Sequence, residues 1–203
     1  MYKLYSYPFS QYSRRAVSLM EQVGIEYENH LINLKEKEQM SEKYIAINPN
    51  HQVPTLLDGD IKIHESNAIL RYLCVKHELF DWYPRDYAAL AKVEQWLDWT
   101  QCQLCPLVET IVVNRILLGE DGDINAASEE EAKLVSRFEV LEDNLKGQKF
   151  LVNENPTIAD LSLASSIFQL KFASVTLESS LIIRWYESVE MLPGFQKSLP
   201  KEQ

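Results

Sequence analysis

Residues 48–66 read NPNHQVPTLLDGDIKIHES and predict a loop, a β-hairpin and the start of a helix. The apolar runs Thr55–Leu57 and Ile61–Ile63 flank an Asp-Gly-Asp turn, which is typical of a hairpin. The residues that follow have helical spacing, so Glu65 and Ser66 lie at the helix N-terminus. A carboxylate, a hydroxyl and backbone N–H groups come together there. This combination suits a ligand that carries both an ammonium and a carboxylate.

Length, composition and charge limit the class of protein. A chain of 203 residues with 46% hydrophobic and 25% charged residues is typical of a globular protein with a sizeable core. The net charge of −10 argues against nucleic-acid binding. No apolar run approaches the roughly 20 residues that span a bilayer, and the N-terminus lacks a signal-peptide pattern. We expect a cytoplasmic protein with no membrane partner, and the three cysteines fit a reducing compartment.

The first 78 residues have the pattern of a small α/β domain. Tyr2–Tyr7 alternates like a strand, Ser13–Val23 has apolar residues at helical spacing and ends at Gly24, and Ile25–Leu34 predicts a second strand. A strand, a helix and a strand with short loops predict a parallel βαβ unit. With the hairpin and the helix after it, the order of elements predicts a thioredoxin-like domain.

After a linker near residues 81–86, helical spacing continues along the chain. Apolar residues from Leu90 to Ile111 form a long amphipathic stripe, with a kink expected near Pro106. Two pairs of residues have the spacing of helix N-terminal caps, and these pairs are Ser128 with Glu131 and Thr157 with Asp160. A final helix is expected near residues 181–189. We therefore expect an all-α helical domain over residues 86–203.

These motifs, in this order, resemble the cytosolic glutathione transferase family over nearly the whole chain. The motifs that carry the resemblance are Asn48-Pro49, Gln52-Val53-Pro54, Asp58-Gly59, Glu65-Ser66-Asn67-Ala68-Ile69, Thr157-Ile158-Ala159-Asp160 and the first turn Pro8–Arg15. The first turn resembles the serine-type classes phi, theta and delta. The resemblance implies a glutathione transferase fold and a homodimeric enzyme. That enzyme would activate glutathione as a thiolate and conjugate it to small hydrophobic electrophiles.

The resemblance also assigns a glutathione-binding site. Pro54 matches the family's cis-proline, which turns the backbone of Val53 toward the cysteinyl part of glutathione. Glu65 matches the partner of the ligand ammonium, and Ser66 matches the partner of the γ-glutamyl carboxylate. The remaining matched residues are Gln39, His51 and Gln52, with Gln39 and His51 near the glycyl carboxylate. At the Gln39 position many serine-type members carry a histidine or lysine, so this contact is expected to be weaker.

Ser10 matches the serine that donates a hydrogen bond to the glutathione sulfur. By stabilising the thiolate, this bond lowers the pKa of the thiol, and each unit corresponds to about 1.36 kcal/mol. Tyr5, Tyr7 and Ser13 are alternatives for the same role, although Ser13 is expected to be a helix cap. Tyr7-Pro8-Phe9 lines up with the Cys-Pro-Phe of the omega class. The tyrosine in place of the reactive cysteine argues against thiol–disulfide exchange.

The resemblance implies an electrophile pocket and a dimer interface. The pocket candidates are Phe9, Tyr12, Val108, Ile111, Val112 and Arg115. The residues expected to face a partner subunit are Asn67, Arg71 and Tyr87. No cofactor besides the co-substrate glutathione is expected. Cys102 and Cys105 have the CxxC spacing of some metal sites, but they lie in a helical stripe. We expect them to be packed core thiols, and we expect no metal site. One of Arg14 and Arg15 is expected to be solvated.

Two other classes of function stay open at this point. A glutathione-dependent peroxidase, dehalogenase or isomerase uses the same fold. A non-catalytic binding or regulatory protein is the other alternative, and the presence of Ser10, Val53-Pro54 and Glu65-Ser66 argues against it.

Overall fold

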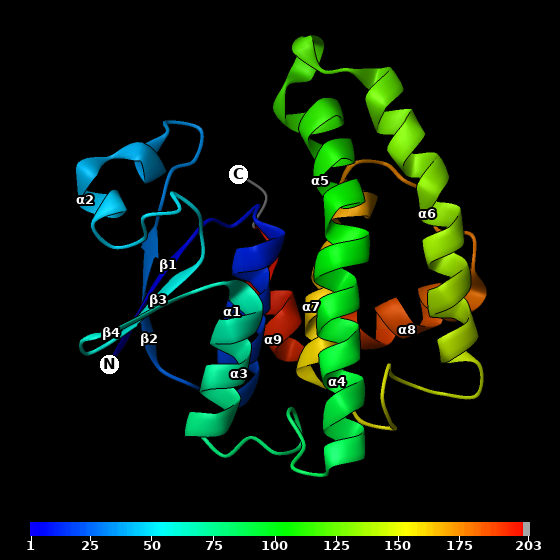
Figure 1. The fold of residues 1–203 in the computed structure, drawn as a ribbon, viewed down its shortest axis with the longest axis horizontal. Coiled ribbons are helices and arrows are strands. Elements are labelled where there is room, and N and C mark those ends of the chain that lie inside the picture. The colour runs from blue at the N-terminus through cyan, green and yellow to red at the C-terminus, as the bar shows by residue number, and fades with distance from the viewer. Residues whose placement is uncertain (201–203) are drawn as a thin grey trace. The chain divides into compact units, whose positions relative to one another are not determined.

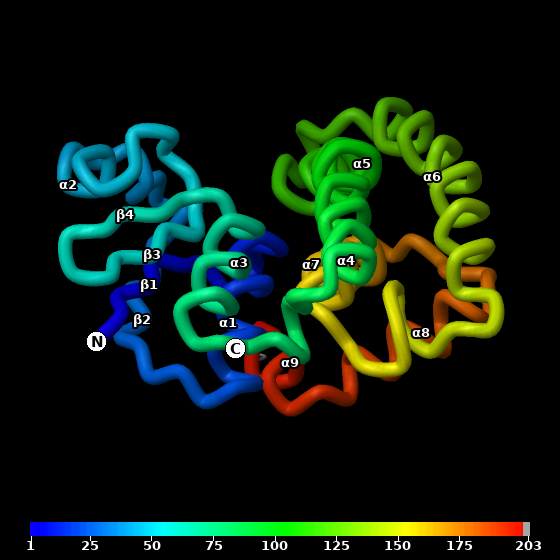
Figure 2. The backbone as a smooth tube through the Cα atoms, turned by 60° about the horizontal axis from the view of Figure 1, so that its bottom comes forward, coloured from blue at the N-terminus to red at the C-terminus, as the bar shows by residue number. Residues whose placement is uncertain are grey.

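The computed structural model describes residues 1–200, which form two compact units. The first unit comprises Met1–Phe80 and the segment from Met191 onward, and the second comprises Asp81–Glu190. The helical domain was expected to continue to the end of the chain. Instead, the last helix, α9 (Pro193–Ser198), packs against α1 (Gln11–Val23) of the first unit (Figure 2).

The first unit is built on a four-stranded sheet with the order β2-β1-β3-β4 (Figure 1). Its strands are β1 (Tyr2–Ser6), β2 (Tyr27–Leu31), β3 (Thr55–Asp58) and β4 (Ile61–His64). β1 is parallel to β2 and antiparallel to β3, and β3 is antiparallel to β4. The predicted βαβ unit and hairpin are therefore confirmed, although β2 is shorter than expected.

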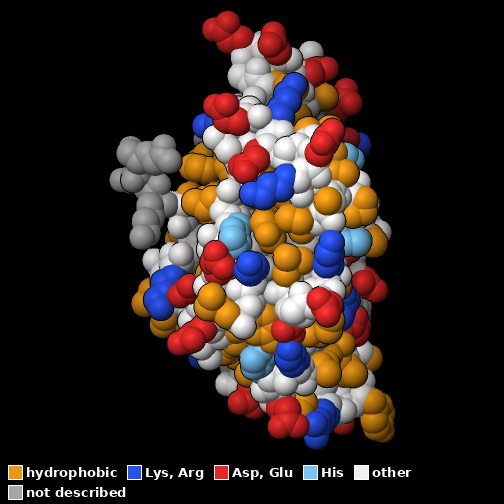
Figure 3. Space-filling view, turned by 90° about the vertical axis from the view of Figure 1, so that its left-hand side faces the viewer, with side chains coloured by type: hydrophobic (Ala, Val, Ile, Leu, Met, Phe, Trp, Pro, Cys, Tyr) orange, Lys and Arg blue, Asp and Glu red, His pale blue; other side chains and the backbone are white. Residues whose placement is uncertain are grey.

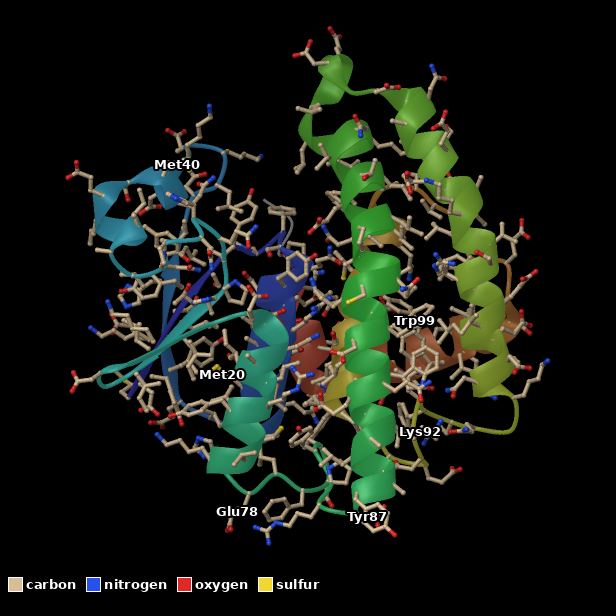
Figure 4. The ribbon with its side chains drawn as sticks, in the orientation of Figure 1. Met20, Met40, Glu78, Tyr87, Lys92 and Trp99 are labelled. Carbon is tan, nitrogen blue, oxygen red and sulfur yellow. The ribbon has the colours of Figure 1, made fainter. Side chains whose placement is uncertain are left out.

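Helices cover both faces of this sheet (Figure 1). α1 and α3 (Ser66–Lys76) pack against each other on one face. The short helices η1 (Glu38–Met40) and α2 (Glu42–Ile45) lie toward the other face. Met20 of α1, labelled in Figure 4, is fully buried in the interior of the unit, whereas Met40 of η1 is 54% exposed.

The start of α1 differs from the sequence-based expectation by two residues. Ser10 is the N-cap, and its Oγ accepts a hydrogen bond from the backbone N–H of Ser13 at 3.2 Å. Ser13 lies in the first turn, where its own Oγ accepts from the N–H of Tyr7 at 3.1 Å. The helix ends at Gly24, whose φ of 72° is readily adopted only by glycine. The hydroxyl of Ser10, and not that of Ser13, therefore caps the helix.

The second unit is helical throughout its regular elements. In chain order they are α4 (Tyr87–Trp99), η2 (Thr100–Leu104), α5 (Cys105–Val112), η3 (Val113–Leu117), η4 (Gly119–Asp121), α6 (Ile124–Leu145), α7 (Ile158–Phe172) and α8 (Ser180–Glu190). From α4 to η3 the helical backbone is continuous (green in Figure 1). The irregularity expected near Pro106 occurs as the wider π-helical turns η2 and η3, while Pro106 itself sits in the first turn of α5.

The prediction that Ser128 and Glu131 begin a helix is wrong. The N-cap of α6 lies five residues earlier, at Asp123, which accepts hydrogen bonds from the N–H groups of Asn125 and Ala126 at 2.9 and 3.0 Å. Ser128 lies inside the helix and donates its hydroxyl proton to the carbonyl of Ile124. Serine commonly bonds back to the preceding turn when it lies within a helix.

The predicted cap at the start of α7 is confirmed. Asp160 is fully buried and accepts hydrogen bonds from the N–H groups of Thr157 (2.8 Å) and Leu151 (2.9 Å). It also accepts from the indole N–H of Trp185 (2.9 Å) and the Thr157 hydroxyl (3.0 Å). Burial raises the pKa of the Asp160 carboxyl, and these four donors act in the opposite direction. This carboxylate joins the loop before α7 to α8.

The cysteines are only partly as expected. Cys105 is buried with its Sγ 3.6 Å from the hydroxyl of Ser166, and Cys74 is also buried, which raises its pKa to about 12. Cys102 is exposed, so the expectation that it is a core thiol is wrong. It lies within the π-helical segment η2. None of the three forms a disulfide.

The surface carries charges of both signs. On the face shown in Figure 3, Lys and Arg side chains are scattered among acidic ones and do not gather into a patch. Within residues 1–200, no helix combines the length and the apolar character needed to cross a bilayer.

Candidate functional site

The strand register brings three separate segments to one edge of the sheet. Tyr5 pairs with Thr55, and Thr55 pairs with His64, so the three residues form a row across β1, β3 and β4. β1 ends, β3 begins and β4 ends at this edge. The first turn with Ser10, the loop ending at Pro54 and the Glu65-Ser66 pair therefore leave the sheet together.

Ser10 occupies the N-terminus of α1 and is partly exposed. Its Oγ accepts the Ser13 N–H, so the hydroxyl proton remains available for another acceptor. A donor at a helix N-terminus favours a negatively charged acceptor, because the helix dipole adds to the attraction. The geometry suits stabilisation of an anion such as a thiolate.

Of the alternative hydroxyl-bearing residues, Tyr5 and Tyr7 are partly exposed, as Ser10 is, and Ser13 is buried. The ring of Tyr5 stacks on His30 with 4.8 Å between ring centroids, and the ring of Tyr7 lies 5.8 Å from that of Phe9. Burial raises the pKa of Tyr7, so its phenol keeps its proton at neutral pH. Ser13 is 1% exposed, so its hydroxyl is less accessible to a ligand than that of Ser10. Its exposure and its place at the helix N-terminus favour Ser10 over Ser13, whereas the phenol groups of Tyr5 and Tyr7 stay alternative donors.

The peptide bond between Val53 and Pro54 is cis, as expected. Val53 is not part of β3, and within residues 1–200 neither its N–H nor its C=O bonds to another backbone group. The preceding carbonyl, that of Gln52, accepts hydrogen bonds from Tyr44 at 2.7 Å and from Asn48 at 2.9 Å. The Val53 backbone is thus open to an extended peptide-like ligand.

Glu65 has an unusual backbone conformation, with φ 70° and ψ 110°. For a residue other than glycine this conformation costs about 1–3 kcal/mol, and such strain tends to occur at functional sites. The Glu65 side chain is exposed and forms no ion pair within residues 1–200. Ser66 directly follows as the first residue of α3 and is 4% exposed.

Arg15 is a site residue whose role sequence reasoning missed. It is 0% exposed, and its Nη1 donates to the Ser66 Oγ at 3.1 Å and to the Asn67 Oδ1 at 3.3 Å. Arg14 is also buried, so the expectation that one arginine of the pair is solvated is wrong. A guanidinium directly behind Ser66 adds positive charge at the N-terminus of α3. A carboxylate is the complementary ligand.

Gln39 and His51 each contain a buried polar atom without a hydrogen-bond partner in the described part of the chain. These atoms are Oε1 of Gln39 and Nδ1 of His51. Leaving such a group unsatisfied costs about 1–3 kcal/mol, so a ligand or water is expected to complete it. His51 also has a positive φ of 56°. Both residues can therefore hydrogen-bond a polar ligand.

The six candidate residues for the apolar electrophile pocket differ in how far they are exposed. In the first unit, Phe9 and Tyr12 are partly exposed. In the second unit, Val108 and Ile111 are 0% exposed and Val112 is 7% exposed. Arg115 pairs with Glu131 and donates to the carbonyl of Ala173 at 3.4 Å. Among these side chains, Phe9 and Tyr12 offer the accessible apolar surface, and the role of the other four stays a prediction.

Comparisons with known proteins bear on the family of this chain. The family model "Glutathione S-transferase, N-terminal domain" matches residues 1–74, and "Glutathione S-transferase, C-terminal domain" matches residues 104–193. Glutathione S-transferase T1 of Arabidopsis thaliana is 37% identical over 83% of this chain and 72% of its own length. The T2 protein of the same plant is also 37% identical, but the match spans 30% of its length. The apo structure of human glutathione-S-transferase T1-1 is 26% identical and superposes with a TM-score of 0.92, covering 98% of this chain and 87% of that one.

Proposed function

The chain belongs to the glutathione S-transferase family, and from this premise we propose that it conjugates glutathione to small hydrophobic electrophiles. The observation that carries the proposal is the shared sheet edge of Ser10, Val53 and Glu65-Ser66. A thiol-activating donor, an open peptide backbone and the carboxylate–hydroxyl pair of Glu65 and Ser66 meet there. Glutathione carries the complementary groups in the same order.

Each end of the tripeptide has a partner of matching charge. The Glu65 carboxylate binds the γ-glutamyl ammonium, and the Ser66 hydroxyl binds the adjacent carboxylate. The dipole of the 11-residue helix α3 and the buried Arg15 guanidinium strengthen this second contact. At the other end, the side-chain amide N–H of Gln39 and a ring N–H of His51 donate to the glycyl carboxylate. These contacts leave the cysteinyl sulfur facing Ser10.

The chemical step follows from this placement. The Ser10 hydroxyl donates a hydrogen bond to the sulfur and stabilises the thiolate, and the thiol proton passes to solvent. The thiolate attacks an electrophilic carbon and forms a carbon–sulfur bond. In a displacement, the leaving group departs with the electron pair of its former bond to carbon. In an addition, the carbanion that forms is protonated.

Turnover with glutathione and a chromogenic aryl halide tests this proposal. We expect the purified full chain to form the coloured conjugate and to be retained on immobilised glutathione. Retention without turnover across several electrophiles would replace the proposal with a non-catalytic binding function. Turnover of a peroxide or of an isomerisable substrate, but not of the halide, would assign another glutathione-dependent reaction. If the protein showed neither retention nor turnover, the proposed glutathione site itself would be overturned.

We expect Glu65→Gln to raise the KM for glutathione about tenfold, which corresponds to about 1.4 kcal/mol of a charge-assisted hydrogen bond. The kcat at saturating glutathione should change little, because the ammonium lies far from the reacting sulfur. Glu78→Gln is the matched control, since Glu78 is also exposed, also has a positive φ (54°) and lies beyond the other end of α3 (Figure 4). Equal KM values for both variants in steady-state assays would contradict the role of Glu65.

We also propose that the protein is a cytoplasmic homodimer. Tyr87, at the start of α4, is 85% exposed (Figure 4), and Val75 of α3 is 63% exposed. Large apolar side chains with this exposure suit burial against a second subunit. Asn67 is 8% exposed and bonded to Arg15, so it contributes less surface to a partner than Tyr87. Analytical ultracentrifugation should give about twice the chain mass of 23.6 kDa, and the monomer mass would contradict the dimer.

A further inference from the structure

Two buried side chains hydrogen-bond both neighbours of the Val53-Pro54 pair. The hydroxyl of Tyr44, in α2, donates to the carbonyl of Gln52 at 2.7 Å and lies 3.1 Å from the hydroxyl oxygen of Thr55. The side-chain amide of Asn48 donates to the same carbonyl at 2.9 Å and to the same hydroxyl oxygen at 3.0 Å. Tyr44, Asn48 and Thr55 are each at most 2% exposed. These hydrogen bonds therefore form in the interior, where the low local dielectric makes them stronger than in water.

The four hydrogen bonds use every available proton once. The carbonyl of Gln52 can only accept, so the Tyr44 phenol gives it its single proton. The Thr55 hydroxyl then donates to the phenol oxygen, while the two amide protons of Asn48 serve Gln52 and Thr55. Both lone pairs of the Gln52 carbonyl are occupied. The direction of this carbonyl group is therefore fixed by two donors, the Tyr44 hydroxyl and the Asn48 amide.

A fixed carbonyl also fixes the N–H on the other side of the same peptide group. The C=O of Gln52 and the N–H of Val53 share one planar trans peptide and point in opposite directions. Within residues 1–200, this N–H has no backbone partner. We propose that Tyr44 is a positioning residue whose hydroxyl aims the Val53 N–H at the cysteinyl carbonyl of bound glutathione. This inference rests on the proposed function and adds a residue to its binding site.

Tyr44 is a more selective probe of this role than Asn48. Asn48 also shapes the loop itself, because its Oδ1 accepts from the N–H of Asn50 at 3.0 Å and its carbonyl accepts from the N–H of His51 at 3.1 Å. Replacing Asn48 would disturb all of these bonds together. Tyr44→Phe removes one oxygen and leaves the ring packed against Ile32 and Val53.

We expect Tyr44→Phe to raise the KM for glutathione about fivefold, the effect of losing one hydrogen bond that orients a binding group. The kcat and the apparent pKa of the bound thiol should stay unchanged, because the sulfur partner Ser10 is untouched. Tyr27→Phe is the matched control. The Tyr27 hydroxyl is also partly buried and hydrogen-bonded, to Glu21 at 3.0 Å, but it lies at the start of β2, away from the site edge.

A ligand analogue makes the test independent of any change in stability. An (E)-alkene isostere of the cysteinyl–glycine amide removes the carbonyl acceptor and keeps the shape of the peptide. By isothermal titration calorimetry, the isostere should bind the wild type more weakly than glutathione does, and Tyr44→Phe should weaken isostere binding no further. An equal loss for both ligands would overturn the positioning role, as would unchanged glutathione affinity in Tyr44→Phe. Failure of the wild type to bind glutathione would instead overturn the proposed function.

Discussion

Asp160→Ala is expected to lower the free energy of unfolding of the second unit by about 4 kcal/mol. The substitution removes the only acceptor that the structure gives to four buried donors, from Thr157, Leu151 and Trp185. Each buried donor left without a partner costs about 1–3 kcal/mol, and relaxation of the loop recovers part of the sum. The effect should therefore exceed the loss of about 1 kcal/mol expected for an ordinary helix cap.

Tryptophan fluorescence during urea unfolding measures this effect selectively. All four tryptophans of the chain, at positions 82, 96, 99 and 185, lie in the second unit, so their emission reports on that unit alone. Asp143→Ala is the matched control, because the Asp143 side chain is 78% exposed and forms an ion pair with Lys146 near the end of α6. The control should shift the midpoint slightly. Equal midpoints for the two variants would contradict the bracing role of Asp160.

The sequence predicted the elements whose signals are local. The Asp-Gly-Asp turn between β3 and β4, the Gly24 cap of α1 and the Thr157–Asp160 cap of α7 each depend on a few adjacent residues. Where two local signals competed, the prediction failed. Asp123 capped α6 before the more obvious pair at Ser128 could do so. Spacing alone does not say which of two caps the chain uses.

Contacts between distant segments were not predictable from the sequence. Gly194 of α9 is buried against α1, where a Cβ atom would collide with the backbone of Ser18 and Gln22, and its N–H donates to the Gln22 side chain at 2.8 Å. The bond from Arg15 to Ser66 spans 51 residues of the chain. Resemblance to a family assigned candidate ligand-binding residues such as Ser66, but not the buried side chains that contact them, such as Arg15. Contacts between residues that are far apart in the sequence become apparent only in the folded structure.

Ser10→Ala is expected to lower the rate of conjugation by about 100-fold at pH values below the pKa of the thiol bound to the wild type. A hydrogen bond to a charged acceptor is worth about 1.5–3 kcal/mol, and a loss near the upper end raises the pKa of the bound thiol by about two units. Below the pKa the thiolate fraction falls tenfold per unit, so the rate falls by the same factor. The affinity for glutathione should change little, because Val53, Glu65 and Ser66 still hold the tripeptide.

The pH dependence separates this role from a general loss of activity. Above the raised pKa the thiol is ionised in both proteins, so the rates of Ser10→Ala and the wild type should converge as the pH rises. A pH–rate profile of kcat at saturating glutathione, with the thiolate absorbance followed in parallel, measures both quantities. A rate deficit that stays constant across the pH range would contradict thiolate stabilisation by Ser10.

Three further variants separate the hydroxyl chemistry from helix capping. Ser10→Ala removes the cap as well as the donor, whereas Ser10→Gly retains most of the helix stability, since glycine costs only a few tenths of a kcal/mol at an N-cap. Both should show the same raised thiol pKa, and Ser10→Thr, which keeps the hydroxyl, should restore a value near that of the wild type. If Tyr7→Phe raises the thiol pKa and Ser10→Gly does not, the phenol at the end of β1 is the donor. We expect the opposite result. The Ser10 hydroxyl is partly exposed at the N-terminus of α1, and its proton stays available because its oxygen accepts the Ser13 N–H.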